Sequence, residues 1–276
     1  MASLRIGRED LASILSQHRG NQALQAAFES AADAPRLLSI LGRYIQFNSA
    51  FGPGLANLAG EIAACQGLFR DPEEPVLILR DRAAHVASDF FYAAIDEFDD
   101  RATPWRDTHR TLAQACLKGM GAYFGYAPAQ LNDVVSINPM TEASIQRVWE
   151  GYGLGARLPE SRLFRGMGFH TGSEILADQE FVIIDRVLKQ TRPEMVAALE
   201  AARVPVLGER HNAYYWIRIH TGVEAEHFDA ALAGVNNALR FYAGETDAGT
   251  VKGWILEGFG HFASVQSDFM AALAQG

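Results

Sequence analysis

The sequence predicts an all-α protein built as one domain. Apolar residues recur at the three- and four-residue spacing of helices along the whole chain, and strand-type alternation is hard to find. Hydrophobic residues make up 49% of the 276 residues, which is enough for a sizeable core. This length lies near the upper end of what a single core serves, and no linker, repeat or low-complexity tract divides the chain. We therefore expect one helical domain over residues 1–276.

Composition excludes several classes of partner and location. The formal net charge of −9 argues against nucleic acid or an anionic membrane as partner. No run approaches the roughly 18 apolar residues of a membrane span, and the first residues lack the apolar stretch of a signal peptide. Only Cys65 and Cys116 are present, too few for a disulfide framework or a cysteine zinc site. We expect a cytoplasmic protein.

Helical spacing and cap residues together predict where each helix lies. Thr103 before Pro104 predicts a helix start, because threonine caps well and proline fits the first helical position. Ser173 before Glu174 predicts another start. Six glycines between positions 151 and 172 predict a flexible loop or lid, with His170 and Glu174 at its end able to approach a pocket. The expected helices are residues 8–18, 21–32, 35–50, 54–69, 75–99, 104–124, 128–136, 140–151, 173–203, 209–243 and 248–274.

The strongest functional signal lies in the expected helix 209–243. His220, Glu224 and His227 fall within roughly 60° of one another on a helix surface, and their stripe also carries apolar residues such as Trp216 and Ile217. Two imidazoles and a carboxylate on a buried face are costly unless a cation neutralises them, and this donor set suits iron, manganese or zinc. The alternative is one satisfied core histidine beside two surface residues.

Glu61 is a second candidate ligand. In the expected helix 54–69 it shares an arc with Leu58 and Cys65, so its carboxylate points inward among apolar neighbours. A partly buried carboxylate favours a cation or a metal as partner. The alternative is a surface acid at the edge of the apolar stripe.

Glu97 and His109 form the third candidate group. They lie on either side of the break at Pro104, so two helices that meet at a turn could bring them to one point. Asp96, Asp99 and Asp100 are rival ligands in the same acidic segment, which could equally be a solvated helix end. Together the three groups offer three carboxylates and three histidines, the inventory of a carboxylate-bridged diiron site in a helical core.

In these residues the chain resembles the haem-oxygenase-like diiron oxidases and oxygenases, often described as iron-containing redox enzymes. That family has a helix glutamate, then an acidic turn with a glutamate and a following histidine, then His-x3-Asp-x2-His near the C-terminus. The resemblance spans about residues 40 to 245, and Glu224 stands where the family usually has aspartate. The matching metal-ligand positions are Glu61, Glu97, His109, His220, Glu224 and His227.

The resemblance implies a haem-oxygenase-like helical bundle that holds two Fe(II) ions per chain and activates O2. Members of the family oxidise small amino-acid-like or carboxylate substrates by N-oxygenation, oxidative decarboxylation or C–C cleavage, commonly in natural-product biosynthesis. An external electron donor and a homodimer are both compatible with it, whereas substrate-binding residues are not defined. The alternatives are a metal-independent enzyme on the same fold, resembling thiaminase II or the quinone-cofactor synthase, and a non-enzymatic helical binding protein.

Overall fold

The computed structural model describes residues 4–65, 67–71, 73–74, 81–100, 103 and 107–275, without the side chains of residues 178 and 222–225. Over these residues the chain forms twelve helices and one two-stranded hairpin, so the predicted all-α bundle is confirmed. The elements are α1 (Arg8–Gln17), α2 (Gly20–Glu29), α3 (Ala34–Asn48), α4 (Phe51–Ala64), α5 (Asp81–Phe98), α6 (His109–Tyr123), α7 (Pro128–Val134), α8 (Pro139–Tyr152), α9 (Glu160–Thr191), α10 (Pro193–Ala201), β1 (Arg203–Val206), β2 (Glu209–Asn212), α11 (Tyr215–Phe241) and α12 (Ala248–Gln275).

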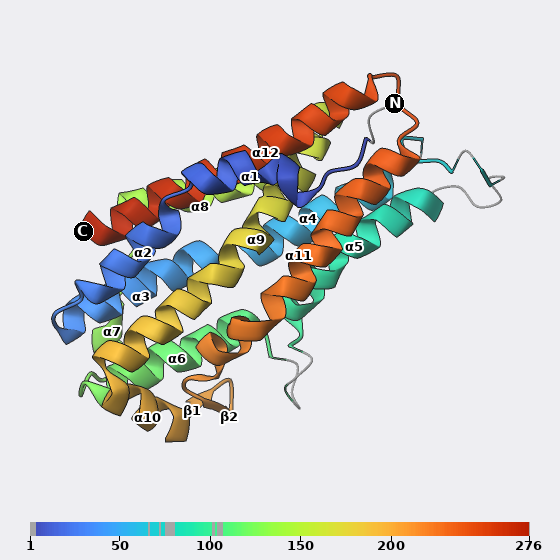
Figure 1. Cartoon of the computed structure of the whole chain (residues 1–276). Helices are drawn as coiled ribbons and strands as arrows, with labels where there is room; N and C mark the ends of the chain where they lie inside the picture. The colour runs from blue at the N-terminus through green and yellow to red at the C-terminus, as the bar shows by residue number, and fades with distance from the viewer. Residues whose placement is uncertain are drawn as a thin grey trace.

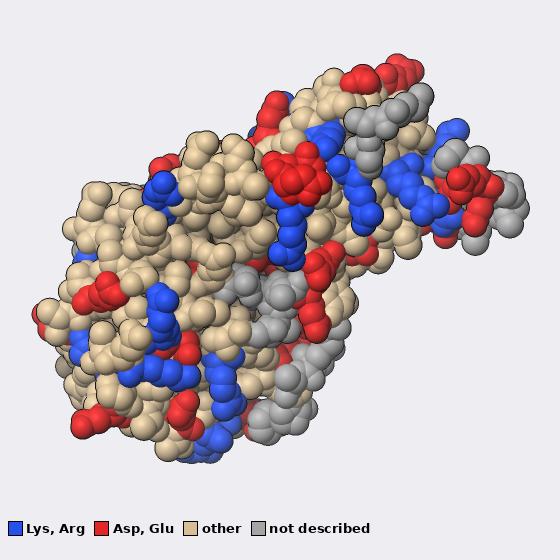
Figure 2. Space-filling view, in the orientation of Figure 1, with Lys and Arg blue, Asp and Glu red and all other residues tan. Residues whose placement is uncertain are grey.

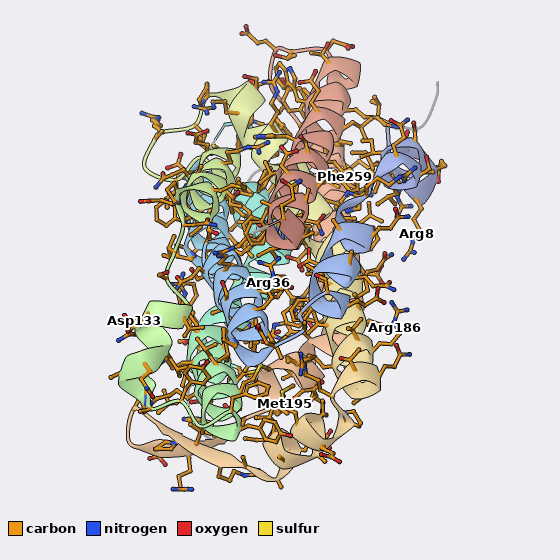
Figure 3. The ribbon with its side chains drawn as sticks, turned by 90° about the vertical axis from the view of Figure 1, so that its left-hand side faces the viewer. Arg8, Arg36, Asp133, Arg186, Met195 and Phe259 are labelled. Carbon is orange, nitrogen blue, oxygen red and sulfur yellow. The ribbon has the colours of Figure 1, made fainter. Side chains whose placement is uncertain are left out.

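The long helix α9 is the centre of the bundle (Figure 1). It packs most extensively against α12 and α11, and α5 packs mainly against α4 and α11. The buried apolar side chains form one continuous cluster that involves most of the helices. Figure 3 shows Phe259 of α12 inside the bundle, whereas Arg8 and Arg186 extend outward. Burial of an apolar stripe on each helix thus drives the assembly.

Helices α9 and α12 approach so closely that their backbones touch. A Cβ atom on Gly168 of α9 would collide with the carbonyl oxygen of Ile255, and one on Gly258 of α12 would collide with the carbonyl oxygen of Arg165. Each helix therefore uses a glycine to admit the backbone of the other. This contact fixes the position of α9 along α12.

The expected loop over residues 151–172 is wrong for most of its length. Helix α8 ends at Tyr152 with Gly153 in the left-handed conformation, and α9 begins at Glu160. Gly166, Gly168 and Gly172 lie inside α9, where they permit close packing rather than flexibility. Ser173 is consequently a mid-helix residue and caps no helix start.

The helix expected over residues 173–203 ends earlier, at Thr191, and the one expected over 209–243 begins later, at Tyr215. Pro193 separates α9 from α10, because proline cannot continue the hydrogen bonding of the preceding helix. Residues 203–212 form the hairpin of β1 and β2, with Val206 paired to Glu209. Leu207 and Gly208 both have positive φ, as a two-residue turn of type I′ requires.

Helix α6 begins at His109, five residues later than predicted. Thr108 caps it, since its side-chain oxygen accepts the backbone N–H of Thr111 at 3.1 Å. The predicted start at Pro104 lies outside the described residues. This start places His109 in the first turn of α6, directly beside the end of α5.

Helices of the described ranges are all too short or too polar to cross a membrane. Figure 2 shows acidic and basic side chains interspersed over one face of the molecule, without a broad patch of either sign. That face therefore offers no extended basic surface for a polyanion.

Candidate metal centre

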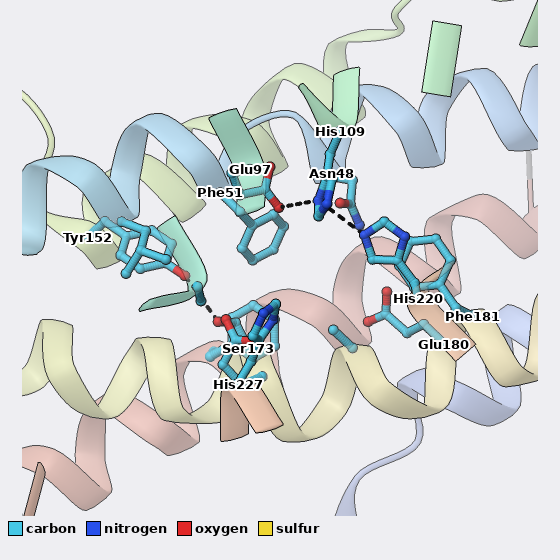
Figure 4. A pocket seen from close by; sticks show the side chains of 15 residues that line it. Asn48, Phe51, Glu97, His109, Tyr152, Ser173, Glu180, Phe181, His220 and His227 are labelled. Carbon is cyan, nitrogen blue, oxygen red and sulfur yellow. Dashed lines mark hydrogen bonds and ion pairs between the residues drawn. The ribbon is translucent and has the colours of Figure 1, made fainter. Parts of the chain in front are cut away.

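A small cavity lies inside the bundle (Figure 4), and its wall includes residues of α3, α4, α5, α6, α8, α9, α11 and α12. Its volume is about 40 Å³, measured as the space open to the centre of a water molecule, which is enough for a few waters. Aromatic side chains of Phe51, Phe181 and Phe262 form much of its apolar wall. Six ionisable side chains besides a tyrosine also line it: Glu97, His109, Glu174, Glu180, His220 and His227.

Glu97, His109 and His220 form the first group on this wall. Nδ1 of His109 lies 3.3 Å from Oε1 of Glu97 and 3.2 Å from Nε2 of His220. Burial raises the pKa of the Glu97 carboxyl, but attraction to His109, with smaller contributions from His220 and Arg110, outweighs it and holds the pKa below its usual value. Glu97 is therefore an ionised carboxylate beside two imidazoles.

The surroundings of this first group orient both rings. Nδ1 of His220 donates to the backbone oxygen of Trp216 at 2.7 Å, and Phe181 stacks on the ring with centroids 4.1 Å apart. This leaves Nε2 of a neutral His220 as the atom that faces His109. Nε2 of His109 lies 3.6 Å from Oδ2 of Asp100, an ionic contact longer than a hydrogen bond.

Glu174, His227 and His170 form the second group, which involves α9 and α11. Oε2 of Glu174 lies 3.5 Å from Nδ1 of His227, and Oε1 lies 3.2 Å from Nδ1 of His170. On its other side, Nε2 of His227 is 2.9 Å from Oδ2 of Asp96. Asp96 thus stands behind His227 as Asp100 stands behind His109, which is how carboxylates orient ligand histidines in metal sites.

His170 is completely buried, and its Nε2 has no hydrogen-bond partner among the described atoms. Burial, reinforced by the neighbouring His227, lowers the pKa of His170 to about 3, so the ring is neutral at physiological pH. Nδ1 of His170 lies 3.3 Å from both the hydroxyl of Tyr152 and Oγ of Ser173. A neutral buried imidazole with an unsatisfied nitrogen is a group that binds metals readily.

Glu180 is the third carboxylate on the cavity wall and has a different environment. The hydroxyl of Tyr44 donates to its Oε2 at 2.6 Å, and the side-chain amide of Gln266 donates to its Oε1. These donors hold Glu180 with its carboxylate at the cavity but away from the second group.

The structure brings four of the six sequence-predicted residues to one cavity: Glu97, His109, His220 and His227. Glu224 lies on α11 between the two histidines, but its side chain is outside the described part of the chain. Glu61 is not on the cavity wall, because it lies six residues beyond Leu55, which is roughly 9 Å along α4. Its carboxylate instead accepts the backbone N–H of Leu158 at 3.4 Å.

From the sequence, Glu174 and His170 were expected to be able to approach a pocket from the end of a loop, but they were not among the predicted metal ligands. Their i,i+4 spacing puts them on one helix face, but the glycine-rich segment before them was expected to be a loop. With α9 beginning at Glu160, both side chains point from a continuous helix into the bundle.

The donor types fit iron, since buried imidazoles and carboxylates are ligands that it takes. Two atoms bound about 2.1 Å from one ion lie about 3.0–3.4 Å apart at octahedral or tetrahedral angles, close to the separations within the first group. Among the described side chains, which exclude Glu224, no set of three or more His, Cys, Asp or Glu residues is arranged to hold a metal ion.

Comparison with protein-family models gives no match, and a search of curated proteins also finds none.

Proposed function

We propose that the chain is a non-haem diiron oxygenase or oxidase that uses O2 to oxidise a small amino-acid-like or carboxylate substrate. The arrangement of His109, His220 and His227 carries the proposal. Each ring has one nitrogen directed at a backbone oxygen or an aspartate and the other directed at Glu97, Glu174 or a second histidine. Histidines oriented from behind in this way are typical of metal ligands.

The two groups divide the ligands between two ions. Glu97, His109 and His220 would hold one iron, and Glu174 and His227 would hold the other. Glu224 would contribute to either or both, from its position between His220 and His227. Bound iron supplies the one-electron chemistry that lets O2 react with an organic substrate.

The surrounding protein groups would hold the ligands and limit the amount of water beside them. Phe51, Phe181 and Phe262 contribute apolar surface to the cavity wall, and apolar surroundings strengthen electrostatic interactions. Burial and the nearby Glu174 carboxylate raise the pKa of Tyr152 well above its ordinary value, so its hydroxyl stays protonated. Tyr152 can therefore donate a hydrogen bond to Ser173 or His170 throughout.

The reaction type follows from the proposed chemistry only as a class: N-oxygenation, oxidative decarboxylation or C–C cleavage. Any of these in which the substrate supplies fewer electrons than O2 consumes needs an external electron donor. A cytoplasmic location suits Fe(II) and the two free cysteines, Cys65 and Cys116.

Iron loading tests the proposal. Purified protein should bind two Fe(II) per chain under anaerobic conditions, measured by elemental analysis after removal of free metal, and should consume O2 on exposure to air. His109→Ala should lose about one iron while its circular dichroism spectrum is unchanged. His85→Ala is the matched control, since His85 is an exposed residue of α5.

A metal-independent enzyme or a helical binding protein would give a different result. It would bind no iron reproducibly, or would bind zinc alone without O2 consumption, and His109→Ala would match His85→Ala. Either outcome refutes the diiron function.

A further inference from the structure

A second, larger pocket opens at one end of the bundle, where α6, α7, α10 and the hairpin meet (Figure 1). Its volume is about 430 Å³, on the same measure that gives about 40 Å³ for the cavity of the candidate metal centre. Sites that hold small molecules have roughly 300–1,000 Å³. No described residue lines both spaces, and Lys118 of the pocket lies roughly 14 Å beyond His109 along α6. The pocket is therefore separate from the metal centre.

The wall of this pocket is mostly apolar. Leu131 of α7 and Leu199 of α10 line it with side chains that are 5% and 1% exposed, and the half-buried Val204 of β1 lies on the same wall. Tyr123 and Tyr126 add two aromatic rings. Such a wall binds the apolar body of a ligand by the hydrophobic effect.

Both charged side chains among the described residues of this wall are cations, Lys118 and Arg203. Nζ of Lys118 donates to the backbone oxygen of Pro205 at 2.9 Å, and a guanidinium nitrogen of Arg203 donates to the backbone oxygen of Ala202 at 3.2 Å. Pro205 comes two residues after Arg203 in β1, so both cations lie on the β1 side of the pocket. Within the described ranges neither pairs with a carboxylate, so their positive charge can attract an anion.

Two such cations stand out in an acidic chain. The sequence has 33 Asp and Glu residues against 24 Lys and Arg residues, so carboxylates are in excess. Arg82, Arg147 and Arg165 each contact one, at 2.6, 2.8 and 2.7 Å. Cations that face an apolar pocket instead of a carboxylate favour a ligand with an anionic head and an apolar body.

We propose that this pocket binds a small amphiphilic anion. Its carboxylate or phosphate head contacts Lys118 and Arg203, and its apolar body lies against Leu131 and Leu199. Arginine suits both kinds of head, because its paired N–H groups match the oxygens of carboxylate and of phosphate. Binding at this end of the bundle goes beyond the proposed diiron function and does not depend on it.

Calorimetric titration of the full chain with octanoate and with octyl phosphate tests the proposal and distinguishes the two heads. We expect one ligand per chain, with weaker binding at higher salt because salt screens the contact with the cations. Octanol has the same body without a charge, and inorganic phosphate has the charge without a body. Each should bind at least about 10-fold more weakly than the preferred octyl anion.

Variants test which residues hold the ligand. Lys118→Gln and Arg203→Gln should each weaken binding by about 10-fold or more, since each removes a charge-assisted hydrogen bond. Arg186→Gln is the matched control, because it removes the same charge from an exposed residue of α9. Ala198→Trp should fill the pocket and abolish binding, whereas Ala197→Trp, an equally exposed neighbour on α10 that is not on the wall, should not.

Three results would overturn the proposal. The first is the lack of saturable binding by either octyl anion, and the second is equal binding in Ala198→Trp and the wild type. The third is equal binding of octanol and octanoate, which would show that the cations do not recognise the ligand. His109→Ala should bind the octyl anion as the wild type does, whether or not iron loads, and loss of binding in that variant would place the ligand at the metal centre instead.

Discussion

Asp96 provides the most direct test of how the second group is held. Its Oδ2 lies 2.9 Å from Nε2 of His227, and His227 in turn directs Nδ1 toward Glu174. Asp96→Asn preserves an oxygen that can accept the same N–H but removes the negative charge. Asp96→Ala removes both the charge and the acceptor.

The size of each effect follows from the strength of that one hydrogen bond. A hydrogen bond to a charged group contributes about 1.5–3 kcal/mol, and one between neutral groups about 1 kcal/mol. Asp96→Asn should therefore cost about 1 kcal/mol of iron binding, and Asp96→Ala about 2–3 kcal/mol. At 1.4 kcal/mol per factor of ten, these losses are roughly 5-fold for Asp96→Asn and 30- to 140-fold for Asp96→Ala, compared with about 10- to 100-fold for residues behind a ligand histidine.

Anaerobic Fe(II) titration against a competing chelator measures these affinities. Binding of only one of the two proposed irons should weaken, because Asp96 orients His227, whereas the first group is oriented by Trp216 and Asp100. Asp89→Asn is the control on the same helix, since Asp89 accepts a hydrogen bond from Asn237 and touches no histidine of the site.

Two results would refute the reasoning. Equal iron affinity in the wild type, Asp96→Asn and Asp96→Ala would show that Asp96 does not orient a ligand. Complete loss of one iron in Asp96→Asn, as expected for Glu174→Gln, would show that Asp96 binds the ion directly.

Three further predictions concern residues outside the two groups. Glu61→Gln should keep both irons in elemental analysis, because the Glu61 carboxylate lies off the cavity wall. Burial raises the pKa of the Cys116 thiol to about 12, so Cys116 should react with a thiol reagent at pH 8 only after the protein is unfolded. Gly168→Ala should cost about 3 kcal/mol through its collision with Ile255, a fall of roughly 5–10 °C in Tm by calorimetry.

Each of these has a contrary outcome. Loss of one iron from Glu61→Gln would restore Glu61 as a ligand, and rapid labelling of native Cys116 would show that its surroundings open. For Gly168 the control is Gly253→Ala on α12, where a Cβ meets nothing within 4 Å and alanine should stabilise the helix by about 0.5–1 kcal/mol. Equal Tm values for the two variants would contradict the close contact of α9 and α12.

Helical periodicity predicted which residues of α11 point inward but could not place every helix against its neighbours. It correctly set His220 and His227 on a buried face. For Glu61 it did not give the position along the axis of α4, and the cavity lies nearer to Phe51 and Leu55. The direction in which a side chain leaves a helix follows from local sequence spacing. Its position along the helix axis relative to neighbouring helices depends on tertiary packing.

The glycines of α9 explain why a loop was wrongly predicted over residues 151–172. A glycine that permits flexibility and one that admits a neighbouring backbone have the same letter in a sequence, and only the packed structure distinguishes them. Because Gly166, Gly168 and Gly172 were assigned to a loop, the helical pairing of His170 with Glu174 was hidden.

The backbone contact between α9 and α12 also affects how rigid the cavity wall formed by α9 and α12 is. Interlocked at Gly168 and Gly258, these two helices can neither slide past each other nor separate without losing their closest packing. The cavity beside them has about 40 Å³ open to the centre of a water molecule, which is enough for a few waters. On the opposite wall the glycines that face α5 meet side chains instead of backbone: Gly52 of α4 faces Glu97, and Gly234 of α11 faces Asp89 and Phe90. We therefore expect the wall formed by α9 and α12 to be more rigid than the wall formed by α5.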